Sequence, residues 1–295
     1  MIRWQNKNRM MGADIMQKFL VVTNEMKDKD GKVTNSVRNY LESKGKECCS
    51  CKKDSDNRII KESIPEDVDC CVMIGGDGSL IEAAKAVENV PILGVNMGTL
   101  GYLTETEVNY VPAALNKIIA GKYYEENRMM LTGKFHSGEV KALNEIVVTR
   151  KGHLRIIHFN LYVNGMLLYS YRADGIIIST PTGSTAYNMS AGGPIVEPTA
   201  QVIIVTPICP HDSSSRSILL SAEDEIAVEI GVARGGKEEL TYLSFDGTDN
   251  YELRSGQRVT IRKAEHPARL IKTGIGTSFL QRFRDKMKGN VRYEN

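Results

Sequence analysis

The stretch CCVMIGGDGSLIEAAKAV, residues 70 to 87, carries the signal that decides the fold of this chain. An apolar run of strand type stops at three glycines around one acid, Asp77, and a helical pattern follows directly. Such a turn exposes backbone N–H groups beside the positive end of the helix dipole, which suits a phosphate group. A carboxylate there would repel phosphate unless it held a metal ion or faced a hydroxyl that attacks the phosphate. The stretch therefore indicates phosphoryl transfer, while capping of the helix by Asp77 is the simpler alternative.

Strand and helix patterns alternate on both sides of this stretch. A short β-branched run at 18–24 precedes a helical pattern that ends at Gly45, and a run at 90–96 precedes another helical pattern at 111–121. Alternation of this kind, which continues to about residue 122, predicts a parallel sheet covered by helices.

A second glycine turn, GVNMGTLGYL at 94–103, follows the next strand and contains Asn96, Gly98 and Gly101. Loops at the carboxyl ends of neighbouring parallel strands meet in one crevice. We therefore expect both glycine turns to face the same ligand.

Two widespread glycine fingerprints do not fit the chain. The glycines at 75, 76 and 78 lack the spacing of the dinucleotide-binding G-x-G-x-x-G motif. The segment GVARGGKE at 231–238 approaches a phosphate-binding loop, but Glu238 stands where the metal-binding Ser or Thr belongs, and a strand pattern follows. We interpret this segment as a hairpin.

Beyond Tyr124, strand-like segments separated by Gly, Asn and Asp turns replace the alternation. Asn164 and Gly165 are typical of a type I′ hairpin turn, which needs two positive φ angles. A helical pattern returns near the end of the chain, at Phe279 and Phe283. The predicted organisation is an N-terminal extension at 1–17, an α/β domain at 18–124 with the GGDG turn, a β-rich domain at 125–272, and a C-terminal segment at 273–295 that packs back on the α/β domain.

Composition excludes several classes of protein. No run approaches the roughly 18 to 20 apolar residues of a membrane-spanning helix, and the segment at 1–16 lacks the apolar middle of a signal peptide. We therefore predict a soluble, cytoplasmic protein. The net charge of +2, without basic blocks, argues against a nucleic-acid partner. The six cysteines are predicted to be reduced thiols, and the C-x-x-C pair Cys48 and Cys51 lacks the other ligands of a zinc site.

Five motifs, in this order and at this spacing, resemble those of the NAD kinases, which phosphorylate NAD to NADP. The resemblance spans roughly residues 18 to 280. GGDG alone also occurs in diacylglycerol and sphingosine kinases and, in related form, in phosphofructokinases, whereas the long Thr/Ser/Gly motif is far more specific. The motifs are GGDGS at 75–79, NMGTLGYLTE at 96–105, LNEIVV at 143–148, DGIIISTPTGSTAYNMSAGGPIV at 174–196 and SFDG at 244–247.

The resemblance implies an NAD kinase-like fold, with a parallel-sheet α/β domain and a mostly β second domain, related to the folds of diacylglycerol kinase and phosphofructokinase. It implies a phosphotransferase that uses ATP or polyphosphate, with Mg²⁺ or another divalent metal, to phosphorylate the 2′-hydroxyl of the adenosine ribose of NAD. It also implies a homodimer or homotetramer in which a neighbouring subunit completes each site. No nucleic-acid or membrane partner is expected. Two alternatives stay open: a lipid or sugar kinase that shares the GGDG turn, and a non-catalytic NAD(P)-binding sensor.

Matching the motifs residue by residue makes Asp77 the candidate catalytic base. Asn144 and Glu145 match an adenosine-binding dipeptide, in which Glu145 accepts hydrogen bonds from ribose hydroxyls. Asp174 matches a residue near the nicotinamide end, and Asp246 matches an acid near the reacting hydroxyl. Gly247 stands where some members have His, so no role of that side chain is carried over. The remaining candidates for the nucleotide sites are Gly75, Gly76, Gly78, Ser79, Tyr102, Arg172, Thr185, Ala186, Tyr187 and Ser190, and no residue set is assigned to a metal.

Overall fold

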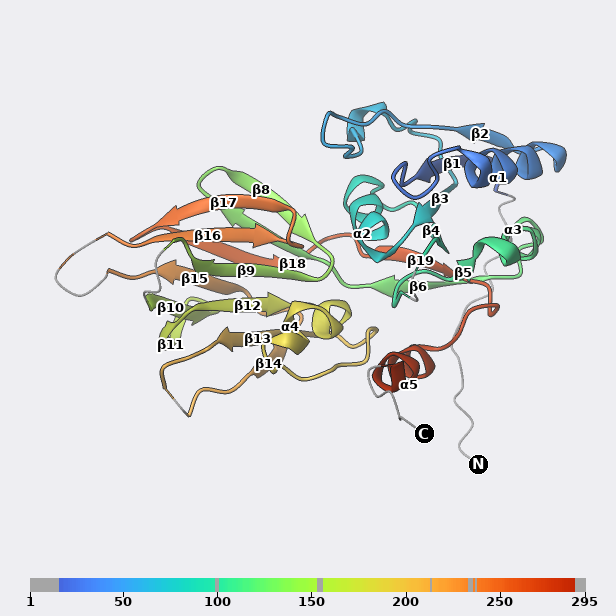
Figure 1. Ribbon diagram of the computed structural model, residues 1–295. Helices are drawn as coiled ribbons and strands as arrows, with labels where there is room; N and C mark the ends of the chain where they lie inside the picture. The colour runs from blue at the N-terminus through green and yellow to red at the C-terminus, as the bar shows by residue number, and fades with distance from the viewer. Residues whose placement is uncertain are drawn as a thin grey trace. The chain divides into compact units, whose positions relative to one another are not determined.

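The computed structural model divides the chain into two compact units (Figure 1). The first unit contains residues 1–127 and 268–295, and the second contains residues 128–267. The structure describes residues 16–98, 101–152, 156–212, 214–232, 236 and 238–289.

A seven-stranded sheet forms the centre of the first unit. The pairs with an assigned register are all parallel, and they include the three strands that the runs at 18–24, 70–75 and 90–96 predicted. In spatial order the strands are β2 (Glu47–Cys49), β1 (Lys18–Thr23), β3 (Cys70–Gly75), β4 (Ile92–Asn96), β19 (Ala268–Lys272) and β6 (Tyr124–Arg128), with β5 (Thr106–Glu107) beside β4.

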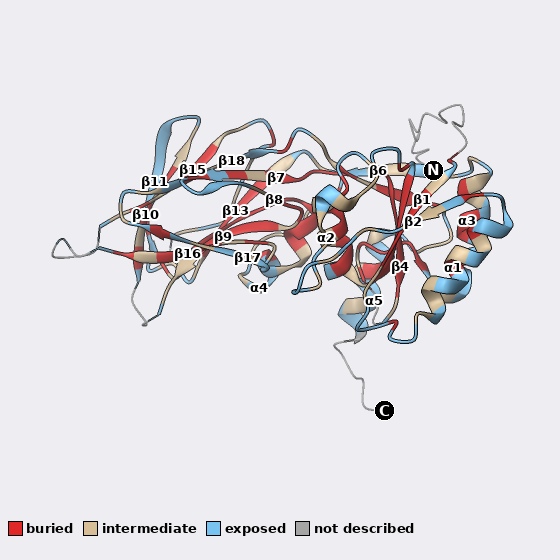
Figure 2. Cartoon of the chain, turned by 90° about the horizontal axis from the view of Figure 1, so that it is seen from above, coloured by how far each residue is buried: buried red, intermediate tan, exposed pale blue. Residues whose placement is uncertain are grey.

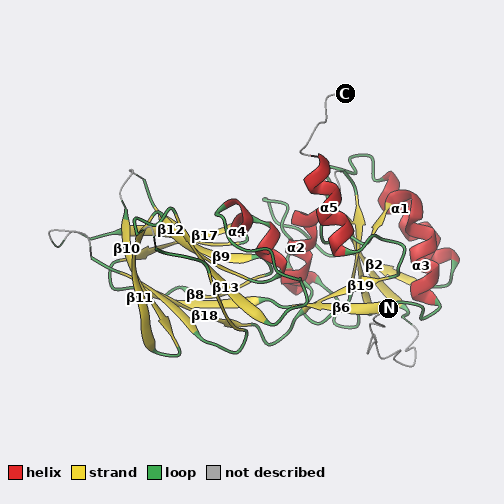
Figure 3. Ribbon diagram, turned by 90° about the horizontal axis from the view of Figure 1, so that it is seen from below, coloured by secondary structure: helices red, strands yellow, loops and turns green. Residues whose placement is uncertain are grey.

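Helices cover both faces of this sheet (Figure 3). The helices α1 (Lys32–Ser43) and α3 (Val111–Ile119) share one apolar cluster with alternate residues of β1, β3 and β4. The helix α2 (Asp77–Ala86) lies against the other face, where a Cβ built at Gly94 would come within 2.5 Å of Leu80 Cδ1. The other helical segments of this unit are α5 (Phe279–Gly289) and the 3₁₀ turns η1 (Lys61–Ser63) and η2 (Val108–Tyr110).

The second unit consists of two six-stranded antiparallel sheets. Buried residues lie along the strands of both sheets (Figure 2). Inward-facing residues of the two sheets, among them Phe159 and Phe245, form one apolar core. One sheet has the order β11 (Met166–Ala173), β10 (Ile157–Val163), β15 (Ile226–Ile230), β18 (Arg258–Lys263), β7 (Leu131–Phe135) and β8 (Gly138–Ala142). The other has the order β14 (Ile218–Ser221), β13 (Val202–Ile208), β12 (Gly175–Ser179), β9 (Glu145–Arg150), β16 (Leu240–Phe245) and β17 (Asp249–Arg254), and the short helices η3 (Thr182–Thr185) and α4 (Tyr187–Ser190) follow β12.

The fold class predicted from the sequence is confirmed, but the structure moves two domain boundaries. Residues 268–272 were expected in the β-rich domain, yet they form β19 of the parallel sheet, where Leu270 pairs with Ile92. The pattern of the strand itself cannot show which sheet it joins, because its partner lies far away in sequence. Residues 125–127 likewise belong to the first unit. Most of the expected N-terminal extension and much of the expected hairpin at 231–238 lie outside the described residues.

Candidate active site

Asp77 joins the two glycine turns of the first unit. It is the first residue of α2, and its carboxylate accepts a hydrogen bond from the Tyr102 N–H to Oδ2 at 2.7 Å and another from the Leu103 N–H to Oδ1 at 3.1 Å. The N-cap residue of the helix is Gly76, which has no side chain, and the Leu80 N–H bonds to the Gly76 carbonyl at 3.1 Å. The acid of the first turn therefore holds the backbone of the second turn, and the two turns lie side by side.

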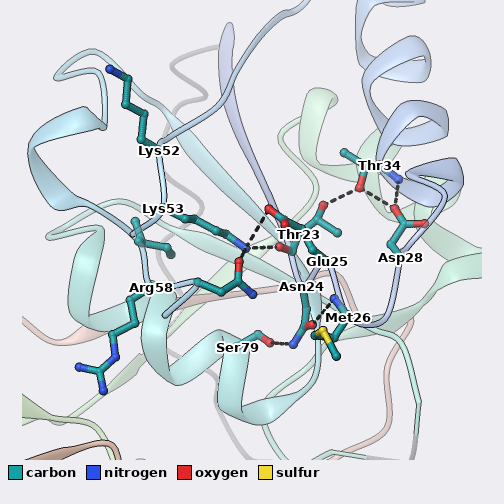
Figure 4. A network of polar contacts seen from close by, with 12 residues as sticks. Thr23, Asn24, Glu25, Met26, Asp28, Thr34, Lys52, Lys53, Arg58 and Ser79 are labelled. Carbon is teal, nitrogen blue, oxygen red and sulfur yellow. Dashed lines mark hydrogen bonds and ion pairs between the residues drawn. The ribbon is translucent and has the colours of Figure 1, made fainter. Parts of the chain in front are cut away.

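Glycine is required where this carboxylate meets the second turn. A Cβ built at Gly101 would lie 2.1 Å from Asp77 Oδ1, closer than any side chain can approach. In the first turn, a Cβ at Gly75 would lie 2.7 Å from the hydroxyl oxygen of Ser79. That hydroxyl is nearly buried and accepts a hydrogen bond from Asn24 Nδ2 at 2.9 Å, which ties the loop after β1 to the GGDG turn (Figure 4).

Lys27, in that same loop, is a cation that the sequence analysis missed. Its Nζ would lie 2.9 Å from a Cβ built at Gly76 and 3.1 Å from one built at Gly98. The ammonium group therefore stands beside both glycine turns, where phosphate groups would lie. The only sequence signal was a polar loop with several charges, KDKDG at 27–31, which is also typical of an ordinary surface turn.

The C-terminal helix α5 holds the second glycine turn from the other side. Arg282 is only 4% exposed, and its guanidinium donates hydrogen bonds to the carbonyl oxygens of Gly101 and Thr104. These carbonyls flank the two N–H groups that bind Asp77. Lys286 lies 4.0 Å from the centroid of the Tyr102 ring, in a cation–π contact. The tail of the chain thus positions the loop that positions Asp77.

In the second unit, a different aspartate holds the Asn144-Glu145 dipeptide. Asp246 accepts hydrogen bonds from the N–H groups of Leu143 at 2.9 Å, Asn144 at 2.7 Å and Glu145 at 3.2 Å. On the carbonyl side, the Thr180 hydroxyl donates to Leu143 O at 2.6 Å, and the Thr180 N–H donates to Asn144 O at 2.8 Å. Backbone bonds on both sides therefore determine the orientation of the dipeptide.

Glu145 is the buried acid of this unit. Its side chain is 93% buried, as the 7% exposed fraction shows, and Oε2 has no hydrogen-bond partner. Burial, and then the negative charge of Asp246, raise the pKa of Glu145 to about 8. An acceptor oxygen without a partner at the wall of a cavity is suited to a ligand that donates hydrogen bonds.

The cavity beside Glu145 has a volume of about 660 Å³ and lies over one face of β9 and β16. Alternate residues of β9 point into it, while Ile146 and Val148 between them point into the apolar core. The lining residues are Glu145, Val147, Thr149, Tyr187, Tyr242, Ser244, Gly247 and Asn250.

Comparison with known proteins gives a consistent result. Residues 7–123 match the ATP-NAD kinase N-terminal domain, and residues 143–273 match the ATP-NAD kinase C-terminal domain. The NAD kinase of Lachnospira eligens is 41% identical, over 92% of this chain and 100% of its own length. The NAD kinase of Agathobacter rectalis is 45% identical, over 92% of this chain and 99% of its own length. The chain belongs to the NAD kinase family.

Solved structures agree with this assignment. An NAD kinase from Archaeoglobus fulgidus in complex with ATP is 28% identical, with a TM-score of 0.74, over 92% of this chain and 98% of that one. Yeast NADH kinase complexed with NADH shares the fold, with a TM-score of 0.82 and 20% identity, over 95% of this chain and 90% of that one. The family, the enzyme class and phosphorylation of NAD are therefore confirmed, in place of the lipid or sugar kinase and sensor alternatives.

The resemblance to the NAD kinases suggested several residues for binding of the dinucleotide. These residues do not all line the same cavity. Tyr187 lines the cavity with Glu145, and Thr185 and Ala186 immediately precede it. Asp174 lies at the other end of β9, where its backbone carbonyl accepts a hydrogen bond from the hydroxyl of Thr149, a lining residue. The Asp174 carboxylate lies 3.4 Å from Arg150 Nη2.

Arg172 and Ser190, two further residues that the resemblance suggested, are not among the residues that line this cavity. Arg172 is an exposed residue of β11, in the sheet that does not contain β9, and its carbonyl accepts the His211 N–H at 2.8 Å. Ser190 is exposed at the end of α4. Among the described residues, no group of three or more His, Cys, Asp or Glu side chains could hold a metal ion, and no helix is long and apolar enough to span a membrane.

Proposed function

We propose that Asp77 is the catalytic base that receives the proton of the NAD 2′-hydroxyl as phosphate is transferred to it. The observation that carries this proposal is the pair of hydrogen bonds from Tyr102 and Leu103, which fix the carboxylate between two glycine turns. Lys27 stands at the same turns. An anchored acid beside a phosphate-binding backbone can orient an attacking hydroxyl without a change in its own position.

Timing of the proton transfer follows from the weakness of a carboxylate as a base. Removal of a proton from a ribose hydroxyl before attack would be very unfavourable, because an alkoxide is a far stronger base than a carboxylate. In a loose, metaphosphate-like transition state the hydroxyl becomes acidic only as its bond to phosphorus forms. Asp77 therefore first accepts a hydrogen bond and then receives the proton late in the reaction.

The cavity of the second unit is the proposed NAD site. Glu145 Oε2, which lacks a partner, would accept a hydrogen bond from a ribose hydroxyl, and Tyr187 offers an aromatic face. Asp174 would serve the nicotinamide end, with Thr185, Ala186 and Ser190 nearby in sequence. Asp246 has a positioning role in this proposal, because three backbone N–H groups already occupy its carboxylate.

We propose ATP as the phosphate donor, held at the GGDG turn with Mg²⁺ or another divalent cation. Among the described residues, no group of three or more His, Cys, Asp or Glu side chains could hold a metal ion. The proposed cation would therefore be bound mainly by phosphate oxygens of ATP and by water, as is usual for Mg²⁺. When bound, the cation would offset the charge of the donor phosphates. Asp77 and Lys27 would hold the hydroxyl and the phosphates that flank it.

We also propose a homodimer or homotetramer in the cytoplasm. The edge strand β11 exposes a run of apolar side chains, Met166, Leu167, Leu168 and Tyr169, which a second copy of the chain could cover. All six cysteines are free thiols, as is usual for a reducing compartment.

The test of this function is NADP formation from NAD, ATP and Mg²⁺ by the purified chain and by Asp77→Asn, with NAD binding measured separately by calorimetry. We expect the parent to form NADP, and the variant to bind NAD normally but to turn over far more slowly. Full turnover by Asp77→Asn would show that Asp77 only holds the loop. Asp30→Asn is the matched control, because Asp30 is an exposed acid of the same unit whose carboxylate lies 3.0 Å from Lys32.

A further inference from the structure

The cavity of the second unit extends well beyond Glu145. This acid stands at one end of the lining, and Thr149 stands four residues further along β9, about 13 Å away at the usual rise of a strand. Tyr242 of β16 lies directly opposite Thr149 in the antiparallel register and lines the same end. The cavity therefore has two separate binding regions, one at Glu145 and one at Tyr242.

Each of these two regions has its own tyrosine. The backbone N–H of Tyr187 faces the carboxyl group of Glu145, so this ring belongs to the first region, and Tyr242 belongs to the second. A dinucleotide carries two ring systems, which are separated by two riboses and a pyrophosphate. With the adenosine ribose at Glu145, the nicotinamide ring would lie in the region of Tyr242, close to Asp174, whose carbonyl accepts the Thr149 hydroxyl at 3.1 Å.

Charged side chains surround the ring of Tyr242. The ammonium of Lys151 lies 5.2 Å from the ring centroid. Glu252 stands opposite Tyr242 in the hairpin of β16 and β17 and forms an ion pair with the same ammonium. Arg150, the residue before Lys151, is paired in turn with Asp174 at 3.4 Å. Both cations of this region are thus neutralised by acids, and the ring, which is 38% exposed, remains accessible from the cavity.

Ring charge is the property that an aromatic side chain can detect here. The nicotinamide ring of NAD is a pyridinium cation, whereas the dihydronicotinamide ring of NADH is neutral. The face of a tyrosine ring attracts a cation through its quadrupole, and a neutral ring gains only the contact area. A free ammonium beside the tyrosine would repel the pyridinium, so the ion pair of Lys151 with Glu252 favours the charged ring.

We propose that Tyr242 selects the oxidised dinucleotide, because its ring faces the nicotinamide cation of NAD while Glu252 neutralises the neighbouring Lys151. The inference rests on the proposed function, since it requires NAD to lie in this cavity with its adenosine ribose at Glu145. It adds a residue that determines specificity: the chain phosphorylates NAD in preference to NADH.

The first experiment measures the KM for NAD and the KM for NADH on the full chain, at saturating ATP and Mg²⁺. Loss of the ring in Tyr242→Leu should raise the KM for NAD about three- to tenfold and leave the KM for NADH within about twofold of the parent value. Tyr242→Phe keeps an aromatic face, so both values should stay within about twofold. The control is Tyr110→Leu, an exposed tyrosine of the first unit, which should change neither value.

Two charge variants should act on NAD in opposite directions. Glu252→Gln leaves Lys151 without its acid beside the ring, and the KM for NAD should rise about two- to fivefold. Lys151→Met removes the competing cation, and the KM for NAD should fall about twofold or more. The KM for NADH should not follow these changes, because its ring carries no charge. A purely structural role of the ion pair would alter both substrates in the same direction, and the exposed Glu139→Gln is the control.

Each outcome bears on the proposal. An unchanged KM for NAD in Tyr242→Leu, or an equal change for NAD and NADH, would overturn it. If the parent forms no NADP, the proposed function fails on its own, and calorimetric titration of the same variants with NAD and with NADH replaces the kinetics. In that titration a loss of affinity confined to NAD supports the role of Tyr242, and equal losses, or no binding of NAD by the parent, refute it. Urea unfolding of each variant would show that the fold is retained.

Discussion

Asp77 and Asp246 make the same kind of hydrogen-bond contact, but the two aspartates have different surroundings. Each carboxylate accepts hydrogen bonds from consecutive backbone N–H groups of a loop that is distant in sequence, two for Asp77 and three for Asp246. Asp77 lies between glycines in a half-exposed turn, and a cation stands beside that turn. Asp246 lies behind a dipeptide, and the acid that faces the cavity is its neighbour, Glu145.

In the proposed function, the carboxylate of Asp77 is the reacting group, whereas the carboxylate of Asp246 supports the backbone of the dipeptide. Glycine on both sides leaves Asp77 open to a ligand, since no Cβ blocks the approach. At Asp246 a third N–H group, that of Glu145, also binds the carboxylate, so this side chain fixes the backbone of the dipeptide. The following experiments would separate these two roles.

The largest effect is expected from Asp77→Asn. An amide cannot receive the hydroxyl proton, and its NH₂ group would face the N–H of Tyr102 or Leu103. We expect kcat to fall about 100- to 10,000-fold, the usual contribution of a general base. The affinity for NAD should change little. A loss of NAD affinity with an unchanged kcat would reverse the roles assigned to the two aspartates.

Replacement of Arg282 by methionine should give the next largest effect. The change leaves the carbonyls of Gly101 and Thr104 without their guanidinium, so the loop that holds Asp77 can shift. Displacement of a reacting group by about 1 Å can lower the rate about 100-fold. We expect kcat to fall by up to this factor while the KM for NAD is retained, and Arg282→Lys to recover part of the rate. The exposed Arg284→Met on the same helix is the control.

Asp246→Asn should act on stability and on NAD binding more than on kcat. An asparagine side chain has one acceptor oxygen in place of two. Because the N–H groups of Leu143 and Asn144 bind different oxygens of Asp246, one of them loses its acceptor. A hydrogen bond to a charged group contributes about 1.5–3 kcal/mol, and we expect a loss of this size in the free energy of unfolding. The KM for NAD should rise in parallel, because the dipeptide loses its fixed orientation. Urea denaturation and steady-state kinetics would measure both, and a fall in kcat as large as that of Asp77→Asn would contradict a positioning role.

The smallest expected effect is a pH dependence due to Glu145. Its pKa is raised from 4.5 to about 8, so between these pH values the folded state holds a proton that the unfolded state has released. The free energy of unfolding should therefore decrease as pH rises through this window, and Glu145→Gln should remove that slope. A ribose hydroxyl binds the ionised form better, so the KM for NAD should fall by less than about tenfold as pH rises through about 8. An identical pH profile in Glu145→Gln would show that another group titrates.

The sequence by itself determined the parallel α/β architecture, the mostly β second domain, and the acids around which the site is built. These features depend on short-range information: periodicity within one strand or helix, and the backbone freedom of the glycines around Asp77. The asparagine and glutamate of the dipeptide were suggested instead by the resemblance of a contiguous motif, LNEIVV, to that of the NAD kinases.

Only the tertiary structure decided which residues contact these acids and hold their loops in place. Arg282 reaches Gly101 across 181 positions, and Asp246 reaches Leu143 across 103, and no periodicity in the chain encodes such contacts. Lys27 gained its place beside the glycine turns from the pairing of β1 with β3, and Glu145 gained its raised pKa from burial next to a second acid. Charge, burial and hydrogen-bond partners are properties of the assembled fold, because each depends on atoms contributed by segments that the chain brings together only when it folds.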